Sequence, residues 1–329
     1  MTIPLKIAGL GRYLPARVVP NSEVERLCGL PAGWVQARTG VRERRWASGE
    51  SNPAMAAHAA REAIEQAGLL PTDIDLILNA SGTQWQHLPD GAPFVQRELG
   101  LADSGVACFS VHATCLSFLL ALETAAALLT VGRYRHILIV STEMPSLAAN
   151  FAEPESASLL GDAAAAAVVV RPEPGEGSLL CASHFETYSS GADFAEIRGG
   201  GTRQHPNRAD TTPQDNLFHM NGPQLLRLTR RYSGDFLERL RPGLSGGLGS
   251  VSWVVPHQAS MLGLRLLRHF GWPEERVLVT LDWLGNSVAA SIPVTLYQGV
   301  QDGRIRRGDE VLLVGTGAGL SLGGVILVF

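Results

Sequence analysis

The sequence predicts an α/β protein made of two similar halves, and three observations carry this prediction. Apolar runs of strand length alternate with longer helical stretches, a pattern typical of buried sheets covered by helices. Three pairs of segments recur in the same order at nearly the same spacing. Proline and glycine also cluster at residues 171–180, close to the middle of the chain.

The strands of the two halves are predicted in matching pairs. The pairs are 73–83 (DIDLILNASGT) with 250–260 (SVSWVVPHQAS), and 136–142 (HILIVST) with 310–316 (EVLLVGT). Each segment contains the apolar run expected of a buried strand. The shift is 177 positions from Ile74 to Val251 and 174 from Ile137 to Val311.

A special helix start completes the repeat. The helix that opens at Cys115 has a counterpart that opens at Asn286, 171 positions later. We therefore predict a first half over 1–172 and a second half over 173–329. Residues 199–217, rich in Gly, Asn, Asp and Thr, predict a long surface loop of the kind that often borders a site.

Composition narrows the class of protein. With 329 residues, 45% of them hydrophobic and 18% charged, the chain can bury a large core. Its net charge of -4, with no dense Lys/Arg tail, makes nucleic acid an unexpected partner. The most apolar stretch, 115–129, contains Glu123 and is too short for a membrane span, so we expect a buried helix there.

The cysteines and the N-terminus indicate a cytoplasmic protein. Four cysteines show neither CxxC pairing nor zinc-type spacing, which favours a reducing compartment and predicts no metal site; they are Cys28, Cys108, Cys115 and Cys181. Residues 1–10 lack a basic region followed by an apolar core, so nothing there predicts export.

Cys115 is the best candidate nucleophile. In HATCLSFLLALETAAALL a short polar stretch gives way to an apolar helix, and Thr114 is predicted to be its N-cap. Unpaired N–H groups at a helix start favour the thiolate. An arbitrary intracellular cysteine is more often a small buried hydrophobe, and we interpret the other three in that way. The absence of GxSxG, HExxH and P-loop motifs leaves the thiol as the strongest nucleophile on local grounds.

Three further segments could complete a site. His257 directly follows the strand SWVVP, at a strand end of the kind where α/β sheets place ligands. Asn286 lies in the turn of LGNSVAASIP, where an asparagine taken alone is more often an N-cap. The Gly-rich segment 315–324 predicts a loop whose N–H groups could approach an oxyanion. A dinucleotide fingerprint would need a further helix, strand and acidic residue, and the sequence ends at Phe329.

Five motifs, in order, resemble the β-ketoacyl-acyl-carrier-protein synthase III family of the thiolase superfamily. They are WVQARTGVRERR (34–45), ATCLSF (113–118), LLGDAAAAAVV (159–169), PHQAS (256–260) and GNSVAASIP (285–293). The resemblance covers essentially the whole chain. It implies a thiolase-like five-layered αβαβα sandwich of two duplicated βαβαβαββ halves, which pairs as a homodimer.

The resemblance also implies a reaction and the residues for it. An acyl-CoA would acylate Cys115, and the backbone N–H groups of Cys115 and Ala318 would bind the oxyanion. A malonyl thioester, on acyl carrier protein or CoA, would then lose carbon dioxide while His257 and Asn286 hold its carbonyl oxygen. No permanently bound cofactor is implied, since CoA thioesters are substrates.

The resemblance also implies residues that bind the substrates. Trp34 and Arg38 would border the CoA adenine and phosphates, and Arg227 would contact the carrier protein. Leu262 replaces an arginine of the family pattern, and Arg265, one turn on, is expected to reach the same phosphate.

Some positions depart from the family pattern. Leu116 and Ser117 replace small residues after the nucleophile, so we expect them, with His112, to shape the wall of the acyl pocket. In PESAS (154–158) an acid and serines stand where the family has an arginine against the CoA adenine.

These departures keep two alternatives open. One is a ketosynthase-like acyltransferase of secondary metabolism that forms an ester or amide. The other is a catalytically silent partner subunit of a heteromeric synthase. Retention of Asn286, whose implied role is to steady an enolate, favours carbon–carbon bond formation.

Overall fold

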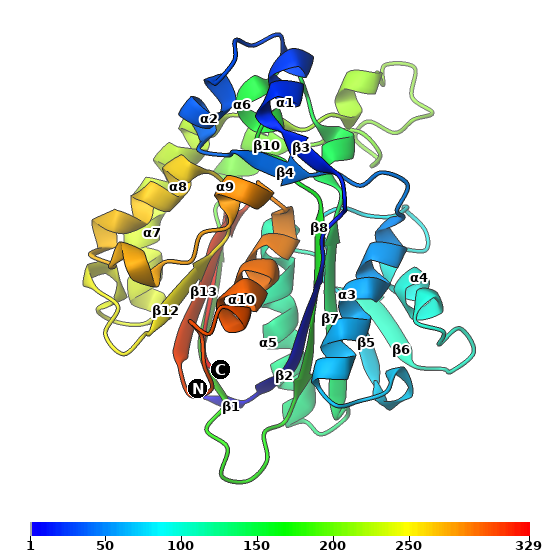
Figure 1. Cartoon of the computed structure of the whole chain (residues 1–329), viewed down its shortest axis with the longest axis vertical. Coiled ribbons are helices and arrows are strands. Elements are labelled where there is room, and N and C mark those ends of the chain that lie inside the picture. Colours follow the sequence, from blue (N-terminus) through cyan, green and yellow to red (C-terminus); the bar gives the residue numbers. More distant parts are fainter. Residues whose placement is uncertain (1) are drawn as a thin grey trace.

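The first of two five-stranded sheets is formed by segments before residue 171. The computed structural model describes residues 2–329, and it orders this sheet β2-β8-β7-β5-β6 (Figure 1). β5 is parallel to β6 and β7, whereas β8 is antiparallel to β7 and β2. The strands are β2 (Lys6–Tyr13), β5 (Leu76–Asn79), β6 (Ala107–Ser110), β7 (His136–Glu143) and β8 (Ala163–Val170).

The second sheet repeats this order. It runs β1-β9-β14-β13-β12, with β12 parallel to β13 and β14 antiparallel to both β13 and β9. The isolated parallel bridge between Val254 and Val277 lies beside β12 as β6 lies beside β5. The strands are β1 (Ile3–Pro4), β9 (Leu179–Thr187), β12 (Trp253–Pro256), β13 (Glu310–Gly317) and β14 (Ser321–Val328).

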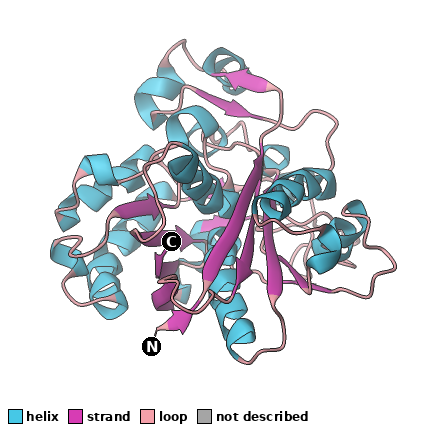
Figure 2. Ribbon diagram, turned by 60° about the horizontal axis from the view of Figure 1, so that its bottom comes forward, coloured by secondary structure: helices cyan, strands magenta, loops and turns pink. Residues whose placement is uncertain are grey.

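Helices form the three remaining layers, as Figures 1 and 2 show. Two helices, α3 and α4, cover the outer face of the first sheet, while α7 and α8 cover the outer face of the second. Between the sheets lie α5 and α10. This arrangement confirms the predicted five-layered sandwich. The helices are α3 (Asn52–Gln66), α4 (Gly91–Glu98), α5 (Ser117–Thr130), α7 (Gly222–Leu240), α8 (Met261–Leu266) and α10 (Ser291–Gln301).

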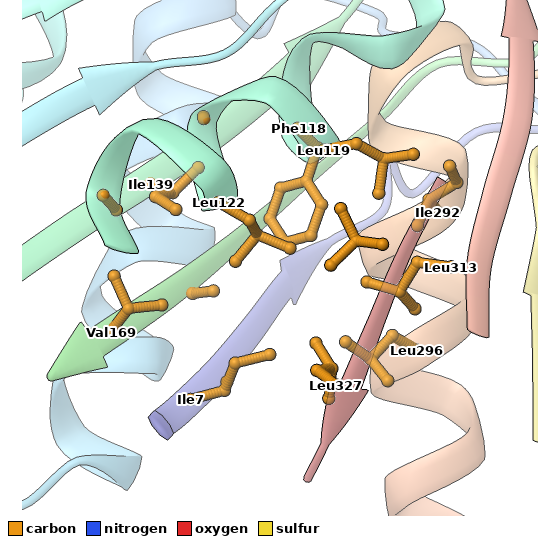
Figure 3. Packing of buried hydrophobic residues seen from close by; sticks show 14 of the residues in the cluster. Ile7, Phe118, Leu119, Leu122, Ile139, Val169, Ile292, Leu296, Leu313 and Leu327 are labelled. Atoms are coloured by element: carbon orange, nitrogen blue, oxygen red, sulfur yellow. The ribbon is translucent and has the colours of Figure 1, made fainter. Parts of the chain in front are cut away.

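The central core explains why α5 is apolar on nearly every side. Phe118, Leu119 and Leu122 of this helix pack between the two sheets, against residues such as Ile139 and Leu313 (Figure 3). A helix covered on both faces needs no polar stripe. Each large apolar side chain buried in this way contributes about 1.5–3 kcal/mol.

A smaller layer lies at one end of the sandwich. β3 (Val18–Pro20) and β4 (Glu43–Arg45) pair antiparallel beside α1 (Asn21–Cys28), α2 (Trp34–Thr39) and α6 (Pro154–Ala157) (Figure 1). The short strands β10 (Ala195–Glu196) and β11 (His219–Met220) flank the predicted loop 199–217, most of which is exposed. α9 (Leu281–Leu284) precedes the Asn286 turn.

The helix starts of the two halves correspond more closely than the sequence comparison indicated. Among residues 2–329, Thr114 and Val288 are the non-glycine residues with positive φ, at 50° and 46°. Each opens a 3-10 turn that leads into a central helix. Their separation is 174 positions, the shift of the β7 and β13 strands. Cys115 therefore corresponds to Ala289, and the pairing of Cys115 with Asn286 was wrong by three positions.

The boundary between the halves lies in an exposed connection. β8 ends at Val170 and β9 begins at Leu179, with the Pro- and Gly-rich stretch between them. Division at 172/173 stays a prediction, and β1 departs from it because it pairs with β9 in the second sheet.

Two features are absent from residues 2–329. No helix in this range is long and apolar enough to span a membrane. No group of three or more His, Cys, Asp or Glu side chains within it is arranged to hold a metal ion.

Candidate active site

Cys115 lies in a strained turn between β6 and α5. The turn, η2, spans Thr114–Leu116, and Thr114 has a left-handed backbone that costs a β-branched residue about 1–2 kcal/mol. The prediction that Thr114 caps the helix was wrong, since its buried hydroxyl has no partner among the described residues. Instead Ser117 secures the turn: its Oγ accepts the Ala113 N–H at 3.0 Å and donates to the Thr114 carbonyl at 2.7 Å.

The Gly-rich segment brings a second N–H group to the sulfur. The N–H groups of Ala318 and of Cys115 itself donate toward the thiol and lower its pKa. Only residues 318–320 form a turn, because most of the segment belongs to the paired strands β13 and β14, so the predicted loop is largely a hairpin. Gly317 lets that hairpin approach, since a Cβ there would lie 2.6 Å from Thr114 Oγ1.

Burial decides the ionisation of the nucleophile. Loss of water around the thiol, followed by the nearby Glu143 carboxyl, raises the pKa of Cys115 to about 12. The donated N–H bonds oppose this shift without reversing it. The expectation that a helix start yields a resting thiolate was therefore wrong, and Cys115 carries a proton before substrate arrives.

His257 is a neutral hydrogen-bond donor. It follows β12, is buried, and donates its backbone N–H to Val314 at 2.8 Å. Burial lowers the pKa of its imidazole to about 4. Nδ1 lies 2.6 Å from Ser291 Oγ, which also accepts the Gln258 N–H at 3.4 Å. With the Ser291 hydroxyl donating to Nδ1, the ring proton belongs on Nε2.

Asn286 is fixed by both its backbone and its side chain. Its N–H donates to the Leu159 carbonyl at 2.6 Å and its carbonyl accepts the Gly161 N–H at 3.1 Å. Oδ1 accepts the Val288 N–H at 2.9 Å, and Nδ2 donates to Ala259 at 3.4 Å. The side chain thus bonds locally, as a cap would, although α10 begins only at Ser291. With Oδ1 engaged, the second Nδ2 proton is the group available to a ligand.

Close backbone approaches bring these segments together. A Cβ on Gly315 would lie 2.6 Å from His257 Cβ and 3.4 Å from Leu116 Cδ2. A Cβ on Gly82 would lie 2.7 Å from Val288 Cγ1 and 3.5 Å from the Thr114 carbonyl carbon. The His257 and Asn286 segments therefore both meet the turn that carries Cys115.

The residues predicted for the acyl pocket have different surroundings. Leu116 is buried in the central core, and a Cβ on Gly323 would lie 3.0 Å from its Cδ1. Ser117 is buried and engaged in the turn, whereas His112 is exposed, with Nδ1 3.1 Å from the Ser81 carbonyl. A role for these three residues in the pocket wall stays a prediction.

The predicted CoA-binding residues lie on the surface helix α2. Trp34 packs against a small apolar cluster, and Arg38 is exposed. Both Nε and Nη2 of Arg38 contact Glu155 Oε1, at 3.0 and 2.7 Å. Glu155 belongs to the PESAS segment, so the acid there already pairs with the arginine predicted to bind phosphate.

The arginines predicted for the carrier protein and for the second phosphate contact lie on α7 and α8. Arg227 on α7 and Arg265 on α8 are both exposed, as is Leu262. A groove of about 350 Å³ beside them is lined by Arg230, Ser233, Gly234, Leu266, His269 and Phe270. Sequence reasoning missed this basic groove because its two helices are separated by β12 along the chain.

Comparisons with known proteins agree with this geometry. A family model for 3-oxoacyl-[acyl-carrier-protein] synthase III matches residues 109–189, and the model for its C-terminal part matches 247–329. The β-ketoacyl-[acyl-carrier-protein] synthase III of Oceanobacillus iheyensis is 34% identical over 98% of this chain and 97% of its own. That of Symbiobacterium thermophilum is also 34% identical, over 98% of each chain. This chain belongs to the β-ketoacyl-[acyl-carrier-protein] synthase III family.

Solved structures place the synthase III fold over the whole chain. The crystal structure of the enzyme from Aquifex aeolicus VF5 superposes with a TM-score of 0.87 at 30% identity, over 99% of this chain and all of its own. The predicted family and fold are thus confirmed, and with them the prediction of a ketosynthase, an acyltransferase that uses thioester substrates. The residue roles were carried over from motifs, and they stay proposals.

Two buried residues of the site were not predicted. Ser291 bonds His257, and Glu143 lies near Cys115. Ser291 was present in the GNSVAASIP motif, whereas Glu143 could have been noticed as an acid that ends an otherwise apolar strand, HILIVSTE.

Proposed function

We propose that this protein takes an acyl group from acyl-CoA onto Cys115 and condenses it with a malonyl thioester. The observation that carries the proposal is the pair of fixed N–H donors, neutral His257 and Asn286, beside the Cys115 turn. Two neutral donors beside one nucleophile in a dry site suit a developing enolate oxygen.

The first half-reaction is acyl transfer. The Cys115 sulfur attacks the acyl-CoA carbonyl, the new S–C bond replaces the bond to the CoA sulfur, and the thiol proton leaves with CoA as its free thiol. The backbone N–H groups of Cys115 and Ala318 stabilise the tetrahedral oxyanion. The resting thiol is protonated and therefore a weak nucleophile. The two N–H groups must lower the barrier by binding the oxyanion more tightly as the S–C bond forms.

The second half-reaction makes the carbon–carbon bond. Malonyl thioester loses carbon dioxide, and the electron pair of the broken bond forms an enolate whose oxygen accepts from His257 Nε2 and Asn286 Nδ2. The enolate carbon attacks the acyl-cysteine carbonyl, and the bond to Cys115 sulfur breaks. The Cys115 thiolate takes a proton from solvent, and the product is a β-ketoacyl thioester.

Acylation followed by peptide mapping tests the first step. After incubation with ¹⁴C-acetyl-CoA and digestion, we expect label on the peptide with Cys115 and none in Cys115→Ser. Addition of malonyl-acyl carrier protein should then release carbon dioxide and discharge the label. Label on another peptide, or none, would contradict the proposal.

Formation of an ester or amide is the second candidate function. It predicts the same acylated cysteine but no release of carbon dioxide from malonyl thioester. The fixed Asn286 amide favours condensation, because an ester- or amide-forming enzyme has no enolate to stabilise. A silent subunit would neither be acylated nor lose activity in its complex when Cys115 becomes serine.

Substrate delivery is proposed for two surfaces. Trp34 and Arg38 are assigned to the CoA nucleotide, with Glu155 weakening the attraction for its phosphates. The groove between α7 and α8, with Arg227, Arg265 and the arginine and histidine that line it, is assigned to an acidic carrier protein.

Self-association and compartment complete the proposal. β6 is an edge strand that pairs only with β5, and its Phe109 side chain is 41% exposed. We propose that two copies pair through these edges into a homodimer. The four cysteines are all unpaired, which supports the predicted cytoplasmic location.

A further inference from the structure

A buried carboxyl group that the proposed reaction does not use lies at the end of β7. Glu143 is fully buried; its Oε1 accepts the Gly82 N–H at 2.5 Å and its Oε2 accepts the Thr83 N–H at 2.7 Å. The nearby N–H of Ala289 also lowers the pKa of this carboxyl, whereas the Thr83 hydroxyl donates to the Thr142 carbonyl at 3.3 Å. These donors satisfy the oxygens of a carboxyl group that would otherwise be costly to bury.

The twofold repeat explains why a backbone N–H faces this carboxyl. η2 of the first half packs on β13 of the second, and η9 (Val288–Ala290) of the second packs on β7 of the first. In the first half, the residue after the left-handed Thr114 is Cys115, and its N–H faces the reacting sulfur. In the second half, the corresponding N–H, that of Ala289 after Val288, faces Glu143. The Glu143 carboxyl therefore lies beside the second-half counterpart of the Cys115 N–H.

The same turn orients Asn286. Val288 is β-branched and left-handed, a conformation that persists only where the surroundings over-determine it. Its N–H donates to Asn286 Oδ1, and the next N–H along the chain, that of Ala289, faces Glu143 where η9 packs on β7. A chain of contacts thus runs from the carboxylate through η9 to the amide that the proposed function uses as a donor.

We propose that Glu143 is a positioning residue, whose carboxyl group holds η9 in the strained turn that aims the Asn286 amide, and whose ionisation places a negative charge near the Cys115 thiol. The inference rests on the proposed function, because it assigns the effect on condensation to Asn286. Its second consequence, the charge beside the thiol, is independent of that assignment.

The charge acts on Cys115 without an offsetting cation. Burial raises the pKa of Glu143 to about 8, and among residues 2–329 only hydrogen-bond donors oppose this rise. The turn 80–83 and η9 bring no ionisable side chain, and β8 pairs with it through Ala163. Asp162 is turned to Ser146, and His257 is neutral. When Glu143 ionises, it raises the pKa of the thiol, so removal of the charge must lower that pKa.

Two variants separate charge from reach. Glu143→Gln removes the charge and one acceptor oxygen, whereas Glu143→Asp keeps the charge but shortens the side chain by one methylene. Iodoacetamide alkylation of Cys115 between about pH 8 and 11, where the wild-type Glu143 is ionised, reports the thiol. Carbon dioxide release from malonyl-CoA reports the Asn286 amide. Glu123→Gln, on α5 and bonded to Ser183, is the matched control and should leave both readouts unchanged.

The two readouts should change in opposite directions in Glu143→Gln. We expect the alkylation profile to shift about one unit toward lower pH. We expect kcat for decarboxylation to fall about tenfold to a hundredfold, with KM nearly constant. Glu143→Asp should lose decarboxylation while its alkylation profile stays near that of the wild type. A purely structural role would lower both rates together with the melting temperature, and that result, or an unshifted alkylation profile, overturns the proposal.

A double-mutant cycle with Asn286→Ala keeps the two proposals distinguishable. If Glu143 acts through Asn286, Glu143→Gln/Asn286→Ala should decarboxylate no more slowly than Asn286→Ala alone. Full decarboxylation by Asn286→Ala would contradict the proposed function. A third outcome would contradict only the positioning role of Glu143. In it, Asn286→Ala loses decarboxylation but Glu143→Gln retains it.

Discussion

The Oγ of Ser291 lies 2.6 Å from Nδ1 of His257, and a hydroxyl that donates to Nδ1 keeps the ring proton on Nε2. Replacement by alanine leaves Nδ1 unpaired in a buried place, and the ring proton can then move to that nitrogen. Nε2 would face the thioester without a proton to donate. The hydroxyl therefore matters for catalysis although it never touches substrate.

We predict that Ser291→Ala lowers kcat for malonyl decarboxylation about tenfold to a thousandfold, the range for loss of one oxyanion donor, with little change in KM. Steady-state kinetics measure both constants. Ser141→Ala, which removes another buried serine hydroxyl bonded to the Ala80 carbonyl, is the control and should retain activity. Unchanged kcat in Ser291→Ala would show that the serine does not set the tautomer.

Glu155 governs how well Arg38 can attract a phosphate. Both nitrogens face the same carboxylate oxygen, so the guanidinium is already paired before CoA arrives. The pair is exposed and contributes at most about 1 kcal/mol to stability, so it can be removed without unfolding the protein.

We predict that Glu155→Ala lowers KM for acyl-CoA about threefold to tenfold, because the freed charge gains a charge-assisted bond to phosphate. KM for the acyl-pantetheine thioester, which lacks the nucleotide, should not change. Glu173→Ala, in the exposed connection between the halves, is the control. If KM changed equally for acyl-CoA and for the acyl-pantetheine thioester, the nucleotide of CoA would not bind beside Arg38.

Motifs predicted residues whose roles depend on neighbours in sequence, and they missed those that depend on the fold. Cys115, His257 and Asn286 each lie in a distinctive local pattern. Glu143 bonds residues near 82 and 289, and Ser291 bonds His257, so neither partnership could be seen along the chain.

Among the elements, the β13–β14 hairpin shows how a composition signal can be misinterpreted. Glycine in sequence predicts turns because it allows positive φ, yet Gly315 and Gly317 lie in a strand. They are small because His257 and the Thr114 turn press against that strand. The apolar strands themselves were predictable, since burial on both faces leaves continuous hydrophobic runs.

Gly317→Ala tests the close approach of this hairpin to the nucleophile. The new Cβ would lie 2.6 Å from Thr114 Oγ1 and must displace the turn. We predict that Cys115 acylation slows about a hundredfold, as expected for a displacement of about 1 Å. Rapid-quench measurement of ¹⁴C-acetyl transfer would detect this. Gly177→Ala, where a Cβ meets nothing within 4 Å, should react at the wild-type rate.

At the scale of the whole molecule, the free edge of the first sheet is where association is expected. β6 has one paired side, and an unpaired strand edge tends to add another strand. Phe109 projects there with 41% of its surface exposed. If two copies pair through this edge, a charged side chain at position 109 would be buried. The free-energy cost of burying that charge would exceed the gain from the hydrogen bonds between the strands.

We predict that the wild-type protein sediments as a dimer and that Phe109→Glu sediments as a monomer at micromolar concentration. Sedimentation velocity distinguishes the two. Val131→Glu, which adds the same charge at a more exposed apolar residue after α5, should remain dimeric. A monomeric wild type would contradict the proposed assembly.

The place of β2 beside β8 in Figure 1 has a consequence for how the chain is made. β2 is an edge strand whose only sheet partner is β8, so residues 6–13 leave the ribosome long before residues 163–170 can pair with them. Throughout that interval β2 has no partner strand for its backbone hydrogen bonds. This is usual for strands whose partners are distant in sequence. Neither sheet can close during synthesis of the first 160 residues, and chaperones have their opportunity to bind this nascent chain within that period.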